Sequence, residues 1–333
     1  MTPQIFRTGI TELFGIRHPF LCGGLMWLAD ATYVGAVVNA GGMGFITPRS
    51  FPAPEAYRAE LRKCREITGG RPFGVNIYVS ARPEANEALG AFLDIAIEEK
   101  VAFVETAGYS PKAFMPRIKD AGMKTIHKCT TLRHAESAVR AGADAVTILG
   151  AEAGGHPGVE LVGTMVQGAL VADALEVPVA LGGGMGTGRQ LLAALALGAD
   201  AMLMGSRMTV ASEIWAHEAY KRHIVGIDQT ATRVIMSVFN DNSRVLDNRT
   251  AREVAALEAE GITDFERYRP LVRGTNQREA YETGDWERGT PSMGQSCAFA
   301  GAIMSVEAIF DEILADAVAH RDRLARLDAA KAG

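Results

Sequence analysis

The sequence predicts a (β/α)8 barrel, or TIM barrel, with a helical subdomain inserted after strand eight. Eight short apolar runs alternate with segments of helical length, and glycine-rich stretches follow the last two runs. Alternating strands and helices indicate a parallel sheet, and eight parallel strands close a barrel. The predicted strands are Phe20–Cys22, Gly44–Ile46, Phe73–Ile77, Ala102–Glu105, Thr125–Lys128, Ala145–Leu149, Pro178–Leu181 and Ala201–Met204.

The segments between these strands are predicted to be amphipathic helices. Three of them end in a glycine just before the next strand, at Gly122, Gly142 and Gly198. A glycine at this position adopts the left-handed conformation that ends a helix and turns the chain. The predicted helices include Glu55–Ile67, Glu84–Glu98, Pro111–Ala121, Leu132–Ala141 and Arg189–Leu197.

The pattern changes after Ser206. The segment from Thr209 to Tyr281 is charged and helical in character, and it contains no clear strand. We interpret residues 207–298 as a helical subdomain that covers the substrate, and residues 1–206 and 299–333 as the barrel. A final helix, about Ala300 to Leu324, is expected to complete the outer ring. The rival fold, an open doubly wound sheet, lacks its G-x-G-x-x-G signature here.

Composition excludes several classes of protein. The net charge of −5 gives no reason to expect nucleic acid as a partner. No apolar stretch is long and uniform enough for a membrane span, and the N-terminal residues lack the pattern of a signal peptide. The four cysteines are scattered without a C-x-x-C pair, so no metal site is expected. We therefore expect a cytoplasmic protein.

Glycines after strands seven and eight predict a phosphate site. The seventh strand runs into Gly183 and Gly184, and the eighth into Gly205 and Ser206. In barrels of this type, the loops after these two strands often bind phosphate. Glycine lets backbone N–H groups approach phosphate oxygens closely, and a hydroxyl adds a further donor. Arg207 either neutralises the phosphate or forms a surface salt bridge.

Polar groups at other strand ends suit a flat heterocyclic ring. Gly23, Gly24 and Leu25 follow the first strand, and Asn76 ends the third. Lys128 lies in an apolar strand, where it should face either solvent or a charged ligand. His127 and the cysteines Cys22 and Cys129 are expected to be structural.

His156 is the sharpest signal for chemistry in the chain. It lies on a glycine-built loop after the sixth strand, in the run Glu152 to Gly158 (EAGGHPG). A histidine at the catalytic face of a barrel can reach substrate and exchange a proton near neutral pH. We therefore expect His156 to be the catalytic base.

These motifs together resemble the nitronate monooxygenase family, formerly called 2-nitropropane dioxygenases. The resemblance extends in order over most of the barrel, and it rests on Pro19 to Trp27 (PFLCGGLMW), Asn39 to Gly44 (NAGGMG), Phe73 to Asn76 (FGVN), the EAGGHPG run, Gly182 to Gly184 and Ala194 to Arg207 (ALALGADAMLMGSR).

The resemblance implies FMN as cofactor, with its phosphate on the two glycine loops. It implies backbone contacts from Gly23, Gly24 and Leu25, and side-chain contacts from Asn76 and Lys128. It also implies contacts from the His156 loop at Ala153, Gly154 and Gly155, and His156 matches the family's catalytic base.

The family contains more than one chemistry, and the sequence departs from each branch in some respect. Glu105 to Gly108 (ETAG) and His127 to Thr130 (HKCT) resemble NADH:quinone reductases, whereas Gly154 to His156 is closer to the monooxygenases and enoyl reductases. The acidic residues expected after Gly158 in the quinone reductases are replaced, and the tyrosine and lysine substrate contacts of the monooxygenases have no clear counterpart.

The leading expectation is oxidation of nitronates or nitroalkanes with O2 to a carbonyl compound and nitrite. The alternative is NAD(P)H-dependent reduction of a quinone or an activated alkene. Two further readings are a cofactor-free barrel lyase or isomerase that binds a phosphorylated sugar and uses Lys128 as a Schiff base, and a flavin-binding module without turnover. Each enzyme reading implies a small-molecule substrate, and a homodimer is left open.

Overall fold

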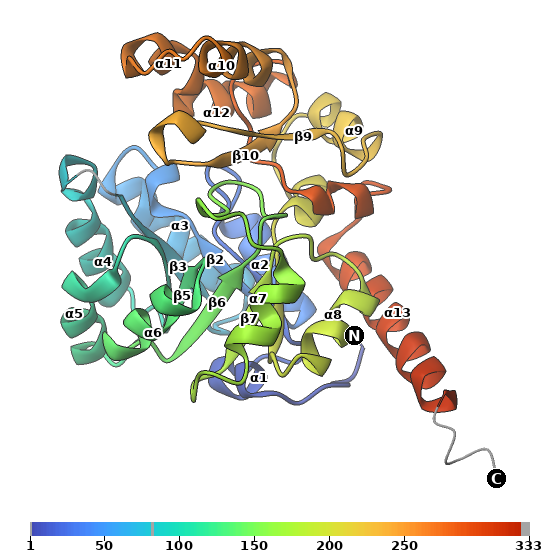
Figure 1. Ribbon diagram of the computed structural model, residues 1–333. Coiled ribbons are helices and arrows are strands. Elements are labelled where there is room, and N and C mark those ends of the chain that lie inside the picture. The colour runs from blue at the N-terminus through green and yellow to red at the C-terminus, as the bar shows by residue number, and fades with distance from the viewer. Residues whose placement is uncertain (1, 81–82, 328–333) are drawn as a thin grey trace.

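Eight parallel strands form a closed barrel, as the sequence predicted. The computed structural model describes residues 2–80 and 83–327. Strand β1 pairs with both β2 and β8, which closes the ring (Figure 1). The strands are β1 (Phe20–Cys22), β2 (Met43–Ile46), β3 (Gly74–Val79), β4 (Phe103–Gly108), β5 (Lys124–Cys129), β6 (Ala145–Leu149), β7 (Val179–Gly182) and β8 (Ala201–Met204).

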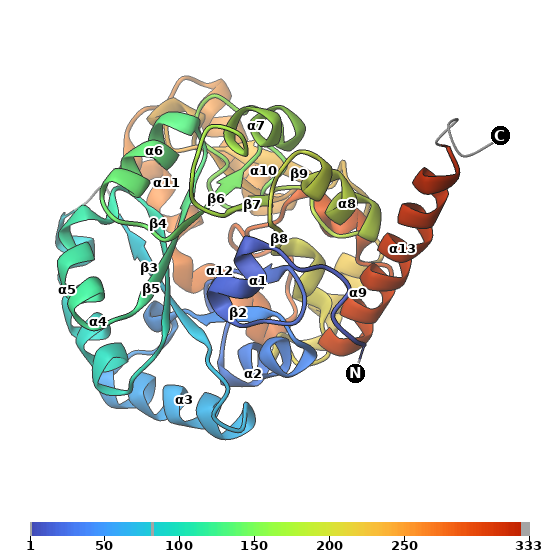
Figure 2. The ribbon, with the colours of Figure 1, turned by 90° about the horizontal axis from the view of Figure 1, so that it is seen from below.

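The lower half of the barrel interior is filled by apolar side chains and closed by a short helix. Residues of α1 (Gly9–Phe14) pack against inward-facing strand residues, and the Phe14 ring lies 4.8 Å from that of Phe103. Seen from below, α1 lies across the open end of the ring (Figure 2). Because this end is plugged, chemistry is confined to the other end, where the strands finish.

The outer ring of helices confirms most predicted segments and corrects some boundaries. Gly122, Gly142 and Gly198 are left-handed, with φ of 72°, 107° and 88°, as expected for helix stops. The predicted Glu84–Glu98 and Pro111–Ala121 each begin as a 3-10 turn, at Pro83–Asn86 and Pro111–Ala113, and the α-helices start at Leu89 and Met115. The helices are α2 (Ala31–Ala40), α3 (Pro54–Ile67), α4 (Leu89–Glu98), α5 (Met115–Asp120), α6 (Leu132–Arg140), α7 (Thr164–Val171) and α8 (Gly188–Ala196).

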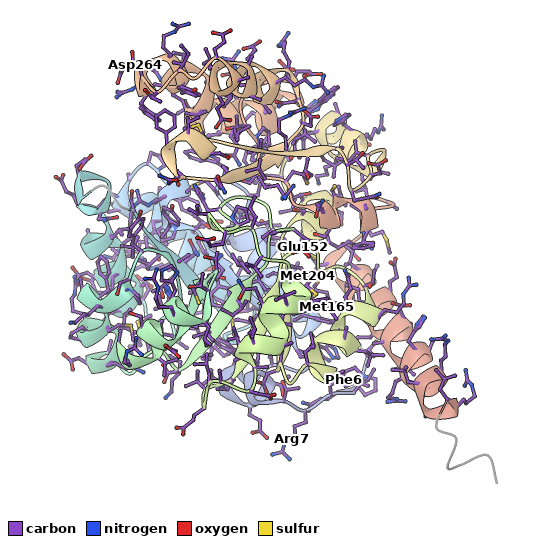
Figure 3. The ribbon with its side chains drawn as sticks, in the orientation of Figure 1. Phe6, Arg7, Glu152, Met165, Met204 and Asp264 are labelled. Carbon is purple, nitrogen blue, oxygen red and sulfur yellow. The ribbon has the colours of Figure 1, made fainter. Side chains whose placement is uncertain are left out.

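Residues 218–283 form a separate layer above the barrel mouth, which we call the cap (Figures 1 and 3). Figure 3 places Glu152 at the mouth and Asp264 at the far edge of the cap. The cap has its own small core, which includes Val254 and Tyr268. Its helices are α9 (Glu218–Val225), α10 (Arg249–Ala259), α11 (Phe265–Val272) and α12 (Gly274–Thr283).

The expectation that this segment contains no strand was wrong. Strands β9 (Thr232–Ile235) and β10 (Ser243–Leu246) form an antiparallel pair within the cap. Each strand has only four residues and carries an arginine, so the alternation that identifies strands is too short to recognise. Arg233 of β9 pairs with Asp247, with its Nε 3.0 Å from Oδ1, which stabilises the hairpin after it has formed.

Helix α13 (Val306–Arg326) returns from the cap to the barrel and completes the outer ring. It begins six residues later than predicted, after a serine cap at Ser305. It packs between α8 and α2, and its Phe310 ring lies 4.7 Å from that of Phe20 in β1. No helix in the described part of the chain is long and apolar enough to cross a membrane.

The contact of α8 with α13 depends on one glycine. A Cβ at Gly188 would collide with the backbone nitrogen of Ala317 and the carbonyl oxygen of Ile313. We expect Gly188→Ala to lower the free energy of unfolding by about 3 kcal/mol, because backbone cannot move aside as a side chain can. Denaturant titration measures the loss. Gly301→Ala, where a Cβ meets nothing within 4 Å, is the matched control, and equal stability of the two variants would contradict this account.

Candidate active site

Three polar side chains share one level of the barrel interior, directly above the apolar layers. Asn76 of β3, Glu105 of β4 and Lys128 of β5 lie at positions that alternation along a strand turns inward. Asn76 pairs in register with Glu105, and Glu105 with Ile126, two residues before Lys128. The strand periodicity therefore assembles one polar group from three separate segments.

Glu105 is the centre of this group. Its side chain is fully buried, and Oε2 accepts hydrogen bonds from Asn76 Nδ2 at 2.5 Å and from the backbone N–H of Gly24 at 2.9 Å. Lys128 Nζ lies 3.0 Å from the same oxygen. Oε1 has no hydrogen-bond partner among the described residues. The lysine that sequence analysis placed in an apolar strand is therefore paired with a buried carboxylate.

The turn after β1 has room for no side chain at its two glycines. A Cβ at Gly23 would lie 2.8 Å from Glu105 Oε1 and 3.1 Å from Lys128 Nζ, and one at Gly24 would overlap Asn76. The Leu25 side chain reaches toward the end of β8, because a Cβ at Gly205 would lie 3.7 Å from its Cδ2. The glycines bring bare backbone to the polar group, as a ring-binding turn requires.

The loops after β7 and β8 have the backbone that a phosphate site requires. Gly183 and Gly184 are left-handed, with φ of 97° and 71°. Gln190 of α8 holds the same loop: its Oε1 accepts from the N–H of Gly186 at 2.9 Å, and its Nε2 donates to the Gly184 carbonyl at 2.7 Å. This capping arrangement fixes the loop at the start of a helix, where anions are favoured.

The hydroxyl of Ser206 ties the end of β8 to the segment that follows the cap. Its Oγ accepts a hydrogen bond from the N–H of Gly294 at 2.7 Å, which leaves its own proton free to be donated. A Cβ at Gly154 would lie 2.6 Å from the same Gly294 nitrogen. Ala153 is buried beside it. The loops after β6 and β8 therefore meet at Gly294.

The β6 loop is also joined to the cap hairpin. The backbones of Gly155 and Arg244 exchange hydrogen bonds of 2.9 and 2.7 Å, and Arg244 Nε donates to the Ala151 carbonyl at 2.9 Å. Gly155 adopts φ of 79°, a conformation that glycine adopts without strain. The loop that carries His156 is thus held at both the barrel and the cap.

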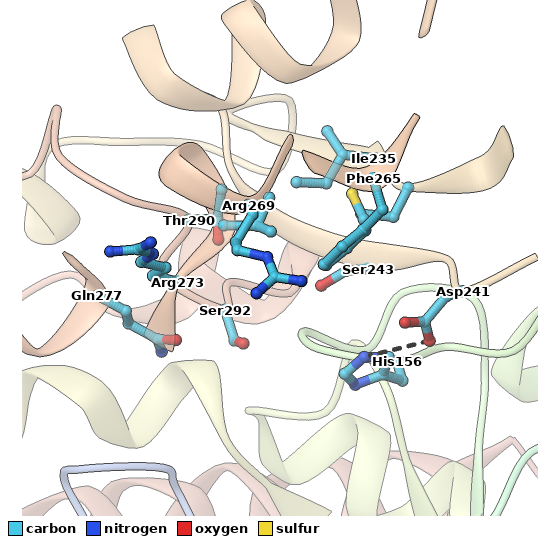
Figure 4. A pocket seen from close by; sticks show the side chains of 12 residues that line it. His156, Ile235, Asp241, Ser243, Phe265, Arg269, Arg273, Gln277, Thr290 and Ser292 are labelled. Carbon is cyan, nitrogen blue, oxygen red and sulfur yellow. Dashed lines mark ion pairs between the residues drawn. The ribbon is translucent and has the colours of Figure 1, made fainter. Parts of the chain in front are cut away.

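His156 faces a pocket between this loop and the cap (Figure 4). The pocket has a volume of about 550 Å³. The His156 side chain is 50% exposed, and its Nε2 lies 3.6 Å from Oδ1 of Asp241, an ion pair when the histidine is protonated. Its ring lies 6.0 Å from that of Tyr78. An accessible imidazole beside a carboxylate can take or give a proton within the pocket.

His127 is buried on the outer face of β5, opposite to Lys128, where the sequence suggested a structural role. Its Nδ1 lies 2.9 Å from the Thr106 hydroxyl. Burial, with the positive charges of His134 and Lys128, lowers the pKa of His127 to about 4. Burial likewise raises the pKa of Cys22 and of Cys129 to about 12. These groups are uncharged at neutral pH.

The sequence suggested that Arg207 either neutralises the phosphate or forms a surface salt bridge. Arg207 does form a salt bridge, but its side chain is buried. Its side chain is 1% exposed, and Nη2 lies 3.1 Å from Oε1 of Glu312 in α13. Nε and Nη1 have no hydrogen-bond partner among the described residues, and burial lowers the pKa of Arg207.

The residues at the mouth fit a phosphorylated flat ring in their chemistry. Flexible glycines and Ser206 lie at the phosphate end, and a glycine turn, an amide and an ammonium group lie at the ring end. The unpartnered Oε1 of Glu105 adds a buried acceptor to the ring end. Among the described residues, no group of three histidine, cysteine or acidic side chains is arranged to hold a metal.

The family model described as nitronate monooxygenase matches residues 7–316 of the chain. The chain belongs to the nitronate monooxygenase family. It is an oxidoreductase, as the sequence predicted. The matched residues include all the motifs on which the predicted resemblance rests.

The relatives of this chain differ in the activities that their names give. A (3aS,4S,5R,7aS)-5-hydroxy-7a-methyl-1-oxo-octahydro-1H-indene-4-carboxyl-CoA dehydrogenase of Mycobacterium tuberculosis is 30% identical over 94% of this chain and 97% of its own. The Rhodococcus jostii enzyme of the same name is 34% identical over 72% of this chain and 66% of its own. A nitronate monooxygenase of Pseudomonas aeruginosa is 28% identical over 91% of this chain and 96% of its own.

A solved structure shares the fold of this nitronate monooxygenase family member over nearly all of the chain. FabK from Thermotoga maritima matches with a TM-score of 0.89 and 33% sequence identity, covering 97% of this chain and 100% of that chain. The barrel and the cap are therefore both represented in that structure.

Sequence reasoning located the family motifs but missed four residues of the site, which are Glu105, Asp241 and two arginines of the cap that line the pocket, Arg269 and Arg273. Glu105 was seen only as part of a motif, and nothing indicated that it joins Asn76 to Lys128. Asp241 and the pocket arginines of the cap carry no motif at all. One signal could have revealed the role of Glu105: Glu105 and Lys128 lie on adjacent strands at positions whose side chains both point into the barrel.

The Glu105–Lys128 pair yields a stability prediction. Glu105→Gln leaves the ammonium of Lys128 largely buried without a counter-charge, so we expect a loss of about 3 kcal/mol in the free energy of unfolding. Adding Lys128→Met should recover much of this loss, because the unpaired charge is then gone. Denaturant titration of both variants tests this. Glu218→Gln, which breaks an exposed pair with Arg222, is the control, with an expected change of less than about 1 kcal/mol.

The buried His127 yields a pH prediction. Its pKa is lowered from 6.5 to about 4 in the folded protein, so the unfolded chain binds more protons between these values. Stability is then fully present above pH 6.5 and declines as the pH falls toward 4. We expect His127→Gln to make the decline between pH 6.5 and 5 shallower. Burial also lowers the pKa of His18 to about 4. The contribution of His18 to the pH dependence of stability therefore remains in this variant. An unchanged slope would refute this assignment.

Proposed function

We propose that the protein binds FMN at the barrel mouth and transfers electrons to or from the acyl part of a coenzyme A thioester. The observation that carries the proposal is the pocket of about 550 Å³ in front of His156. A pocket of this size suits a ligand much larger than a small nitroalkane. The carboxyl-CoA dehydrogenases at 30% and 34% identity support the same class of substrate.

The residues of the barrel mouth would hold the cofactor in two parts. Gly183, Gly184, Gly205 and Ser206 would bind its phosphate. The ring would lie against the turn from Gly23 to Leu25 and the loop from Ala153 to Gly155, with Asn76 and Lys128 at its edge. When bound, FMN supplies hydride transfer, while the protein supplies position and charge.

His156 would manage the proton that accompanies the hydride. In oxidation, the imidazole takes a proton from the carbon next to the thioester carbonyl, and in reduction it returns one to the same carbon. Asp241 Oδ1 lies 3.6 Å from Nε2 and would orient the imidazole. Tyr78 packs beside the ring and limits its movement.

Oxidation of nitronates is the second candidate. The match to the nitronate monooxygenase model and the Pseudomonas aeruginosa relative favour it. With a nitroalkane as substrate, the imidazole of His156 would take the proton next to the nitro group. A nitronate has already lost this proton and would need no base. The products would be a carbonyl compound and nitrite, with O2 as the acceptor.

One set of assays separates these functions. Purified protein loaded with FMN should be bleached anaerobically by an acyl-CoA or by NAD(P)H, and enoyl-CoA should restore the colour after reduction. Nitrite release from propionate 3-nitronate in air, without bleaching by an acyl-CoA or NAD(P)H, would instead establish the second candidate. Restoration of the colour by a quinone but not by enoyl-CoA would identify a quinone reductase.

His156→Gln tests the proton transfer. We expect turnover to fall about 100-fold or more, because a glutamine cannot exchange the proton, while FMN remains bound. Tyr78→Phe is the control variant, since it preserves the ring that packs beside His156. Turnover by His156→Gln within a factor of two of the parent protein would exclude His156 as the base.

A further inference from the structure

The pocket in front of His156 has charged side chains on two opposite sides. The His156–Asp241 pair lies on one side, and Arg269 and Arg273 project from the cap on the other (Figure 4). Both arginines come from α11 and its junction with α12. The reacting group and the two cations therefore face the same cavity from different elements.

The two guanidinium groups are available to a ligand. Arg269 Nη2 lies 2.6 Å from Oε1 of Glu266, but the two side chains are 50% and 65% exposed. An exposed pair of this kind contributes little and exchanges readily. Arg273 forms no ion pair with any residue in the described part of the chain. The arginine side of the pocket thus carries net positive charge.

The backbone places Arg273 at a break between two helices. Pro270 lies inside α11, and Arg273 itself has extended backbone, with φ of −59° and ψ of 130°. Asn276 Nδ2 donates to the Pro270 carbonyl at 2.7 Å and so fixes the break. Neutral donors, Gln277 and Ser292, line the space beside the arginines. Guanidinium groups with neighbouring donors are typical of phosphate recognition.

We propose that Arg269 and Arg273 form a subsite for the phosphate groups of a nucleotide-bearing ligand. In the proposed function, on which this inference rests, that ligand is the coenzyme A part of the thioester. Its acyl end then points to His156, and its phosphates remain at the cap. The diphosphate of NAD(P)H has the same chemistry, so the two sources are separated by experiment.

The test is binding of free coenzyme A to the FMN-loaded protein, measured by calorimetry. We expect Arg269→Gln with Arg273→Gln to weaken binding at least 10-fold, because both charge-assisted contacts to the phosphates are lost. Arg267→Gln is the matched control, because Arg267 lies on the same helix but does not line the pocket. It should leave the affinity unchanged. Pantetheine, which lacks phosphates, should bind the parent and the double variant equally.

NADPH is titrated in parallel. An arginine-dependent affinity for NADPH but not for coenzyme A supports the subsite and identifies the dinucleotide as its occupant. Unchanged affinity of the double variant for both ligands overturns the inference. Arginine-dependent binding of coenzyme A without turnover of any acyl-CoA would overturn the proposed function and leave the subsite standing.

Discussion

The buried carboxylate of Glu105 is the interaction on which the mouth of the barrel depends. Three donors from three other segments converge on one of its oxygens: the Gly24 N–H, the Asn76 amide and the Lys128 ammonium. A buried charge is tolerated only when it is paired and hydrogen-bonded. The pairing therefore fixes the positions of β1, β3 and β5 at the level where the strands end. The first turn can approach this group closely because Gly23 and Gly24 have no Cβ.

The two halves of the mouth are built on different principles. The half formed by β1 to β5 is held by side chains that cross between strands. The half formed by β6 to β8 is held by contacts to glycine backbone, in which the side chains of Gln190 and Ser206 bond to Gly184 and Gly294. One side of the mouth thus offers charged and amide side chains to a ligand, and the other side offers backbone N–H groups. A ligand with a heterocycle at one end and a phosphate at the other matches this division.

The sequence was sufficient where local patterns determine structure. The eight barrel strands, the glycine helix stops and the His156 loop are each specified by a few consecutive residues, and the structure has them close to where they were predicted. Interactions across the chain were not predictable in this way. The partner of Lys128 lies 23 positions earlier, and Asp241 reaches His156 only because the hairpin β9–β10 pairs with the β6 loop. That hairpin was itself missed, because its strands are too short to show alternation.

The return of α13 to the barrel has a consequence for the order of assembly. Phe20 in β1 is covered by Phe310 of α13, although these residues lie near opposite ends of the sequence. On the ribosome, the first strand would emerge on the order of tens of seconds before the helix that shields it. During that interval the flank between α8 and α2 remains open and apolar, a surface that a chaperone can recognise.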